Sequence, residues 1–299
     1  MLVATLRAVA CGAPARLEDT LRDDVFLRQQ PVAPTCPPHA TAVHSIVTTP
    51  ETTLVASAQT LTVVAKQSGD HAELVRQSRF LRRHPRETLF LLGTRVPEVC
   101  GADLRTLATL SQHGVRDAEF HDTAAVAAVR TRDWSIFDVR SGTAVGGGTD
   151  GGESVVSAGN AVVVGGETTR AYDVRTFRRV WESDAAGRVV RRGTGVLVLG
   201  ARAVMLGDDG RVVWQRAEAW GCAERDPDAE FWAVGRGRDV VAVASVDGRE
   251  VGVFPAAHHG TATAVCWDTD VLELVTGDSE GVVFTWNGWS RSEVVDEWD

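Results

Sequence analysis

The residues best suited to chemistry stand near the end of the sequence, where His258 and His259 are followed by Thr276, Glu280 and Trp286. Imidazole and carboxylate groups can ligate a metal ion or transfer protons. However, adjacent residues of a strand point to opposite faces, so the two histidines cannot share one metal ion, and no third ligand is evident. We therefore expect no metal site here and interpret the set as an internal hydrogen-bonded network.

Known catalytic motifs are missing from the sequence, which contains no GxSxG, HExxH or Walker motif and no EF-hand spacing. Its one glycine-rich run, 146–152, is followed by Glu153 rather than by the Lys-Ser or Lys-Thr of a phosphate-binding loop. We interpret this run as a loop between repeats. The sequence therefore predicts a protein that is not an enzyme and has no catalytic residue and no cofactor.

Short strands that repeat along the chain must position these residues. In the stretch from His258 to Trp286, the runs TAVCW, LELVTG and GVVFTW are rich in Val, Thr and aromatic residues and are separated by turn residues. Similar units recur upstream, with central strands such as 88–93, 161–167 and 240–245. Self-similarity at a period of a few dozen residues indicates a repeat fold, and about seven units lie within the usual range of β-propellers.

The repeats predict an all-β fold, a single β-propeller of about seven four-stranded blades that occupies residues 41–299. Residues 1–40 are irregular and rich in proline near their end. We interpret them as an N-terminal segment that is available to contribute a strand to ring closure.

Two repeats carry an aromatic-Asp pair at the end of a strand, Phe137-Asp138 in SIFDVRSG and Tyr172-Asp173 in AYDVRT. With the last repeat, they resemble the WD-repeat β-propeller family, in which Trp-Asp takes this place. The aromatic ring fills space between blades, and the Asp side chain accepts hydrogen bonds from the turn that follows. The resemblance implies structural roles for Asp138 and Asp173.

The same resemblance implies a buried hydrogen-bonded set in the last repeat. The family's histidine would be His259 or its neighbour His258, the strand hydroxyl Thr276, the turn acid Glu280 and the indole Trp286. The acid is Glu where the family usually has Asp. Such groups can satisfy one another inside a blade, so a structural network is expected rather than a catalytic site.

The segment ASVDGREVGVF (244–254) is similar to a blade of a WD subfamily, the propellers of the spindle checkpoint and of mRNA export. That subfamily presents an arginine to a glutamate-containing partner peptide, and Arg249 matches it. Segments 157–176 and 279–287 resemble neighbouring blades of the subfamily. An extra repeat lies between the first two matching segments, and little chain follows the last one, so the blade order departs from the subfamily pattern.

A second arginine-rich stretch, RQSRFLRRHPR, contains Arg82, Arg83 and Arg86. Arginine pairs well with carboxylates and phosphates, so these residues are candidates for docking an acidic or phosphorylated partner. The alternative is a solvated strand and loop.

Composition narrows the function classes. The formal net charge of -9 argues against direct nucleic-acid binding, and no apolar run approaches the roughly 18 residues that cross a bilayer. The five cysteines are scattered and never form a CxxC pair, which fits a reducing compartment. We therefore expect an intracellular protein, nuclear or cytoplasmic, with no membrane partner.

The pattern as a whole predicts a non-catalytic scaffold, one subunit of a multiprotein complex, that binds an extended or acidic peptide of another protein. Two alternatives stay open. DDGRVVW and RTFRRVW resemble propellers with pyrroloquinoline-quinone-type repeats, in which a Gly turn leads to a strand ending in Trp, here Trp214 and Trp181. Such a propeller would be an enzyme or an envelope assembly factor. The other alternative is a nucleic-acid-associated propeller.

Overall fold

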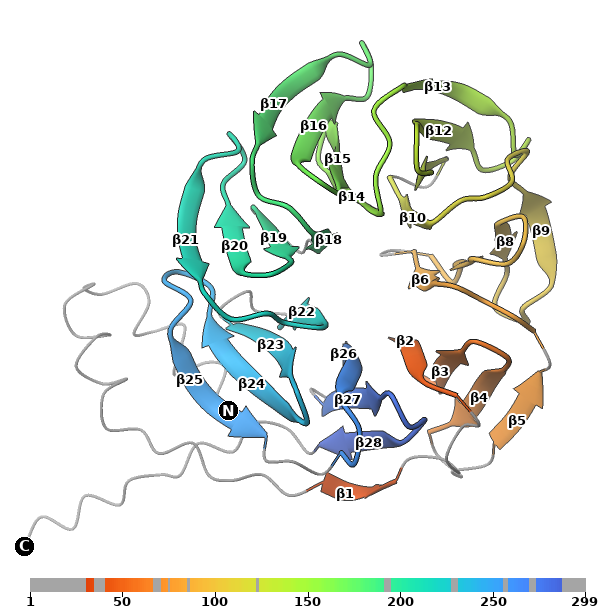
Figure 1. The fold of residues 1–299 in the computed structure, drawn as a ribbon. Coiled ribbons are helices and arrows are strands. Elements are labelled where there is room, and N and C mark those ends of the chain that lie inside the picture. The colour runs from red at the N-terminus through yellow and green to blue at the C-terminus, as the bar shows by residue number, and fades with distance from the viewer. Residues whose placement is uncertain are drawn as a thin grey trace, which may run out of the picture.

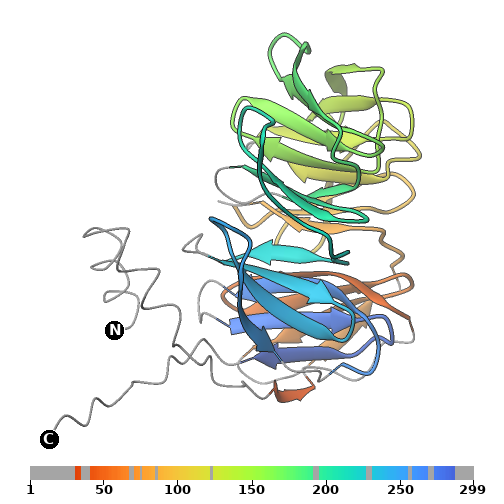
Figure 2. The same ribbon diagram turned by 60° about the vertical axis from the view of Figure 1, so that its left-hand side comes forward.

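The computed structural model contains seven four-stranded antiparallel sheets arranged around a common axis, which confirms the predicted all-β propeller (Figure 1). In the rotated view the sheets stand side by side as blades (Figure 2). The structure describes residues 31–34, 41–66, 71–74, 76–84, 87–121, 124–190, 195–226, 231–254, 258–268 and 273–286. Most of the N-terminal segment, 1–30 and 35–40, therefore lies outside the described residues.

The blades are numbered in chain order. Within each blade the strands are given from the innermost to the outermost. Blade 1 consists of β2 Val43–Thr48, β3 Thr52–Ser57, β4 Leu61–Ala65 and β5 His71–Leu74. Blade 2 consists of β6 Leu81–Arg83, β7 Phe90–Leu92, β8 Glu98–Cys100 and β9 Thr106–Thr109. Blade 3 consists of β10 Asp117–Phe120, β11 Ala125–Val129, β12 Trp134–Asp138 and β13 Ala144–Gly148.

The next three blades repeat the same meander. Blade 4 consists of β14 Ser154–Ala158, β15 Ala161–Gly165, β16 Thr169–Asp173 and β17 Arg179–Ser183. Blade 5 consists of β18 Arg188–Val190, β19 Val196–Leu199, β20 Ala203–Leu206 and β21 Val212–Arg216. Blade 6 consists of β22 Ala223–Arg225, β23 Phe231–Arg236, β24 Asp239–Ala244 and β25 Glu250–Phe254.

Blade 7 joins the two ends of the described chain. It consists of β26 Ala262–Asp268, β27 Glu273–Asp278, β28 Val283–Trp286 and, as its outermost strand, β1 Pro31–Pro34. β1 pairs antiparallel with β28, with Pro31 opposite Trp286 and Pro34 opposite Phe284. Prolines suit this position because an outermost strand needs no second row of amide donors.

Side chains of the innermost strands bind the backbone of the next blade. Leu81 N donates to Ser45 Oγ at 3.3 Å, linking blades 1 and 2. Val189 N donates to Ser154 Oγ at 2.7 Å, linking blades 4 and 5. Thr263 Oγ1 donates to Val43 O and so links blade 7 to blade 1. These bonds satisfy buried backbone groups that no neighbouring strand of the same sheet reaches.

The outermost strands of blades 2–6 begin in the same way. The turn before each of them contains a residue with a left-handed backbone: Leu104 (φ 60°), Gly142 (66°), Phe177 (55°), Gly210 (78°) and Gly248 (69°). Three residues later, the pairing with the third strand shifts by one residue in every case. The extra, unpaired residues of these β-bulges are Leu107, Val145, Val180, Val213 and Val251.

An aromatic ring packs on a glycine between successive outer strands. Trp181 of β17 covers Gly210, where an added Cβ would lie 2.6 Å from the ring, and its Nε1 donates to Asp208 O at 2.9 Å. Trp214 of β21 covers Gly248 in the same way, with Nε1 bonded to Ser245 O at 2.9 Å. Both of these tryptophans therefore tie one blade to the turn of the next.

Between blades 3 and 4 the pair is reversed. The turn residue is Phe177, and the strand residue that it covers is Gly146, where an added Cβ would collide with the ring. The sequence places the two partners of this contact 31 residues apart, in different repeats. Each of these contacts therefore pairs an aromatic ring with a glycine. Between blades 3 and 4 the ring belongs to the turn and the glycine to the strand.

Replacing Gly210 with Ala is expected to destabilise the fold more than replacing Gly237. Both glycines have positive φ (78° and 61°), but only Gly210 lies under a ring, and a Cβ on Gly237 would meet nothing within 4 Å. We expect Gly237→Ala to cost about 1 kcal/mol and Gly210→Ala about 1–3 kcal/mol more. Urea unfolding measures both variants, and equal losses would contradict the packing contact.

Candidate functional site

The polar network of the last blade is built from His258, Thr276 and Trp286. Trp286 Nε1 donates to Thr276 Oγ1 at 2.8 Å, and His258 Nε2 lies 2.8 Å from the same oxygen. The indole can only donate, so Thr276 Oγ1 accepts from it, and the hydroxyl proton is directed to Nε2 when the imidazole carries its own proton on Nδ1. In that tautomer the protonated Nδ1 faces Asp278 Oδ2 at 3.4 Å.

Asp278 holds the turn between β27 and β28. Its Oδ1 accepts from Glu280 N at 3.0 Å and Val282 N at 2.8 Å, and its Oδ2 accepts from Gly260 N at 3.3 Å. The side chain is completely buried. One carboxylate thus fixes the tight turn and the loop that carries His258.

The network decides between the two candidate histidines and corrects the assignment of the acid. The buried histidine is His258, whereas His259 is exposed, and the buried acid is Asp278, whereas Glu280 is exposed. The short Asp side chain at the end of β27 reaches backbone amides two and four residues ahead, as turn-forming Asp residues do. Thr276 and Trp286 lie where the sequence placed them.

Burial prevents this network from acting as a catalytic triad. The order carboxylate, imidazole, hydroxyl is that of hydrolase triads. However, Thr276 has no exposed surface, and its oxygen is already bonded to the Trp286 indole. Burial lowers the pKa of His258, and Asp278 offsets this only in part. A neutral, enclosed imidazole stabilises the blade and has no access to a substrate.

Asp138 and Asp173 lie at the ends of third strands and bind the turns that follow. Asp138 Oδ1 accepts from Ser141 N at 2.8 Å and from Ser141 Oγ at 2.9 Å. Asp173 Oδ1 accepts from Thr176 N at 2.8 Å and from Thr176 Oγ1 at 2.9 Å. These hydrogen bonds lower the pKa of both carboxyl groups.

The arginine-rich stretch is not one exposed patch, because β6 is the innermost strand of blade 2 (Figure 1). Arg82 pairs with Asp117 at 2.9 Å and with Glu119 at 3.3 Å. Arg83 Nη1 donates to Thr48 O at 2.6 Å, while its Nε is buried without a partner among the described residues. Arg86 lies outside the described residues.

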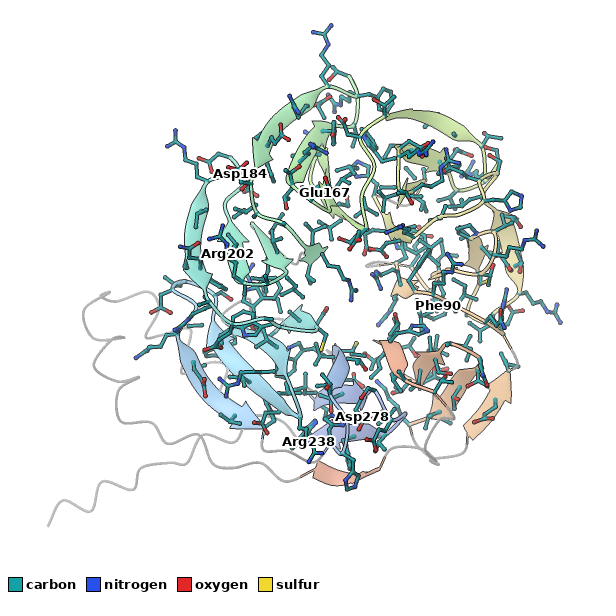
Figure 3. All side chains as sticks on the ribbon, viewed as in Figure 1. Phe90, Glu167, Asp184, Arg202, Arg238 and Asp278 are labelled. Atoms are coloured by element: carbon teal, nitrogen blue, oxygen red, sulfur yellow. The ribbon has the colours of Figure 1, made fainter. Side chains whose placement is uncertain are left out.

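Some side chains extend into the centre of the ring, as Figure 3 shows, whereas others of the innermost strands, such as Ala118 and Phe120 of β10, are buried between blades. Burial raises the pKa of Glu119 to about 7; Arg82 opposes this rise, whereas Asp117 and Glu224 add to it. Asp117 also accepts from Val155 N at 3.2 Å and so links blades 3 and 4. Sequence reasoning missed this charged cluster, whose only signal is the alternating acids of the segment DAEF.

Arg249 lies in the turn that leads into β25 and is half-buried. Its backbone N–H donates to Asp247 Oδ1 at 2.8 Å. Its side-chain Nε is buried and has no hydrogen-bond partner in the described part of the chain. A buried donor without an acceptor costs free energy.

A small depression that is open to solvent lies beside this turn, between blades 5 and 6. Its wall includes two arginines and two glutamates, which are partly paired, since Arg236 Nη1 lies 2.7 Å from Glu250 Oε2. The lining residues are Arg216, Glu218, Trp220, Arg236, Val241, Val243, Gly248 and Glu250.

Comparison with known proteins identifies no relative, since no protein-family model matches the chain and no curated protein matches it significantly. Within the described ranges, no three His, Cys, Asp or Glu side chains gather as metal ligands would. No helix in that part of the chain has the length and apolar character needed to cross a membrane.

Replacing Thr276 with Val is expected to destabilise the protein by about 2–4 kcal/mol, because the shape is kept while the Trp286 indole loses its acceptor and the His258 ring loses its donor. Replacing the exposed His259 with Ala is expected to change stability by less than about 0.5 kcal/mol. Urea unfolding measures the free energy of unfolding of both variants. A large loss for His259→Ala with a small loss for Thr276→Val would contradict the assignment of His258 and Thr276 to the buried network.

Glu119 is expected to make stability depend on pH. Its pKa is raised from 4.5 to about 7 in the folded protein, so its stabilising contribution is complete below pH 4.5 and decreases as the pH rises to about 7. Glu119→Gln is neutral at every pH, as protonated Glu119 is, so the variant does not lose this contribution when the pH rises. The variant should therefore gain stability relative to the native chain between pH 4.5 and 7, measured by urea unfolding at each pH. A pH-independent difference would show that Glu119 titrates normally.

Proposed function

We propose that this protein is a non-catalytic interaction scaffold of the WD-repeat type. The network of His258, Thr276, Trp286 and Asp278 supports the family assignment, because it contains the histidine, hydroxyl, indole and turn acid that the resemblance implies. With Asp in the acid position, the fit is closer than the sequence suggested. These polar residues stabilise the fold. Partner binding is therefore assigned to the turns that connect the strands of the rigid blades.

The partner is an acidic, extended peptide of another protein, and Arg249 is its receptor. The observation that carries this proposal is that the half-buried side chain of Arg249 has no hydrogen-bond acceptor and no salt-bridge partner among the described residues. A glutamate side chain would supply that acceptor as a charge-assisted hydrogen bond. By this proposal the protein is a subunit of a nuclear or cytoplasmic complex related to the checkpoint or mRNA-export propellers.

A second candidate, a quinone-binding propeller, is favoured by one observation. Trp181 and Trp214, the two residues that carry that resemblance, both pack on the turn glycine of the next blade. Incubation with pyrroloquinoline quinone, followed by gel filtration, separates the two candidates. A visible absorbance that stays with the protein supports the quinone-binding candidate, whereas a scaffold retains none.

Arg249→Ala is expected to remove stoichiometric protein partners. Tagged native protein, Arg249→Ala and the control Arg238→Ala, which changes an exposed arginine of the same blade, are purified from cells and their partners identified by mass spectrometry. We expect the control to keep the native partners and Arg249→Ala to lose them, with the melting temperature of each variant within a few degrees of the native value. The same set of partners for the native protein and for Arg249→Ala would contradict the proposal.

A further inference from the structure

Three unpaired arginines lie in two neighbouring turns, one in blade 3 and one in blade 4. Arg140 stands between β12 and β13, and Arg175 and Arg178 stand between β16 and β17. All three are exposed, and none lies within salt-bridge distance of a carboxylate in the described ranges. The acids nearest in sequence, Asp138 and Asp173, are bonded to their own turns.

Exposed aliphatic side chains adjoin these arginines. Val145 and Val180 are the bulge residues of β13 and β17 and are 60% and 61% exposed. Phe177, which lies between Arg175 and Arg178, packs on Gly146, the residue after Val145. This contact brings the turn of blade 4, which carries Arg175 and Arg178, against the outer strand of blade 3 next to Val145.

The composition of this surface indicates its ligand. Unpaired guanidinium groups bind carboxylates or phosphates. Aliphatic groups beside them favour a ligand that also buries apolar surface, which a nucleic-acid backbone does not offer. A protein segment that mixes acidic and aliphatic side chains satisfies both requirements.

We propose that Arg140, Arg175 and Arg178, with Val145 and Val180, form a docking surface for an acidic, aliphatic segment of a partner protein. This inference rests on the proposed scaffold function and adds a contact two and three blades away from Arg249. Arg249 stands in the equivalent turn of blade 6. The two sites therefore share one face of the ring, because alternate turns of an antiparallel meander lie at the same end of the blades.

The test compares two triple variants. The first changes the proposed surface (Arg140→Gln, Arg175→Gln and Arg178→Gln). The matched control changes three exposed arginines in turns between second and third strands, which lie at the opposite end of the blades (Arg132→Gln, Arg202→Gln and Arg238→Gln). Figure 3 labels two of the control residues.

The probe is a fluorescein-labelled peptide in which Glu alternates with Val, and its binding is followed by fluorescence anisotropy. The native protein and the control should bind with equal affinity. The first variant should bind about tenfold more weakly, since three exposed ion pairs contribute about 0.5 kcal/mol each. A second variant, Val145→Ser with Val180→Ser, should also bind the probe more weakly, which a purely electrostatic attraction would not predict.

Three results would overturn the inference: equal affinity of the two triple variants, no binding of the probe to the native protein, or tighter binding of a single-stranded oligonucleotide than of the probe. The proposed function is tested separately by co-purification with Arg249→Ala. If Arg249→Ala loses its partners while the first triple variant keeps them and binds the probe normally, the scaffold function stands and this docking surface is rejected.

Discussion

Every blade must have both of its faces covered by neighbouring blades, and the rest of the structure depends on this constraint. The sheets are apolar on both sides, and buried clusters combine residues of adjacent blades, as Trp214 of blade 5 does with Trp232 and Val243 of blade 6. A sheet at the end of an open row would expose one such face. The row therefore has to close, and β1 closes it by pairing with β28.

The polar network lies in the blade where closure occurs. Trp286, which donates to Thr276, belongs to β28 and stands opposite Pro31 of β1. This blade is held together by strands from both ends of the described chain, so part of its sheet lacks the covalent turn that connects strands elsewhere. Asp278 fixes the turn between β27 and β28 and the loop that carries Gly260 together, which stabilises this blade.

The sequence allowed the seven blades, the turn roles of Asp138 and Asp173, and the positions of Thr276 and Trp286 to be predicted, because strand periodicity and turn residues are local signals. It did not distinguish His258 from His259, or Asp278 from Glu280. Residue type does not reveal which of two polar neighbours is buried in a turn. The pairing of Arg82 with Asp117 and Glu119 was also missed, because the packing of blade 3 on blade 2 brings β6 and β10 together and nothing local encodes it.

The repeated bulges have a consequence for behaviour at high concentration. An outermost strand normally presents a regular row of free amide and carbonyl groups, on which a strand of another molecule can assemble. In blades 2–6 one extra residue interrupts that row near its start and twists it. The outer edge of blades 2–6 is thus a poor template for fibril growth, and recognition along it proceeds through side chains rather than through added strands.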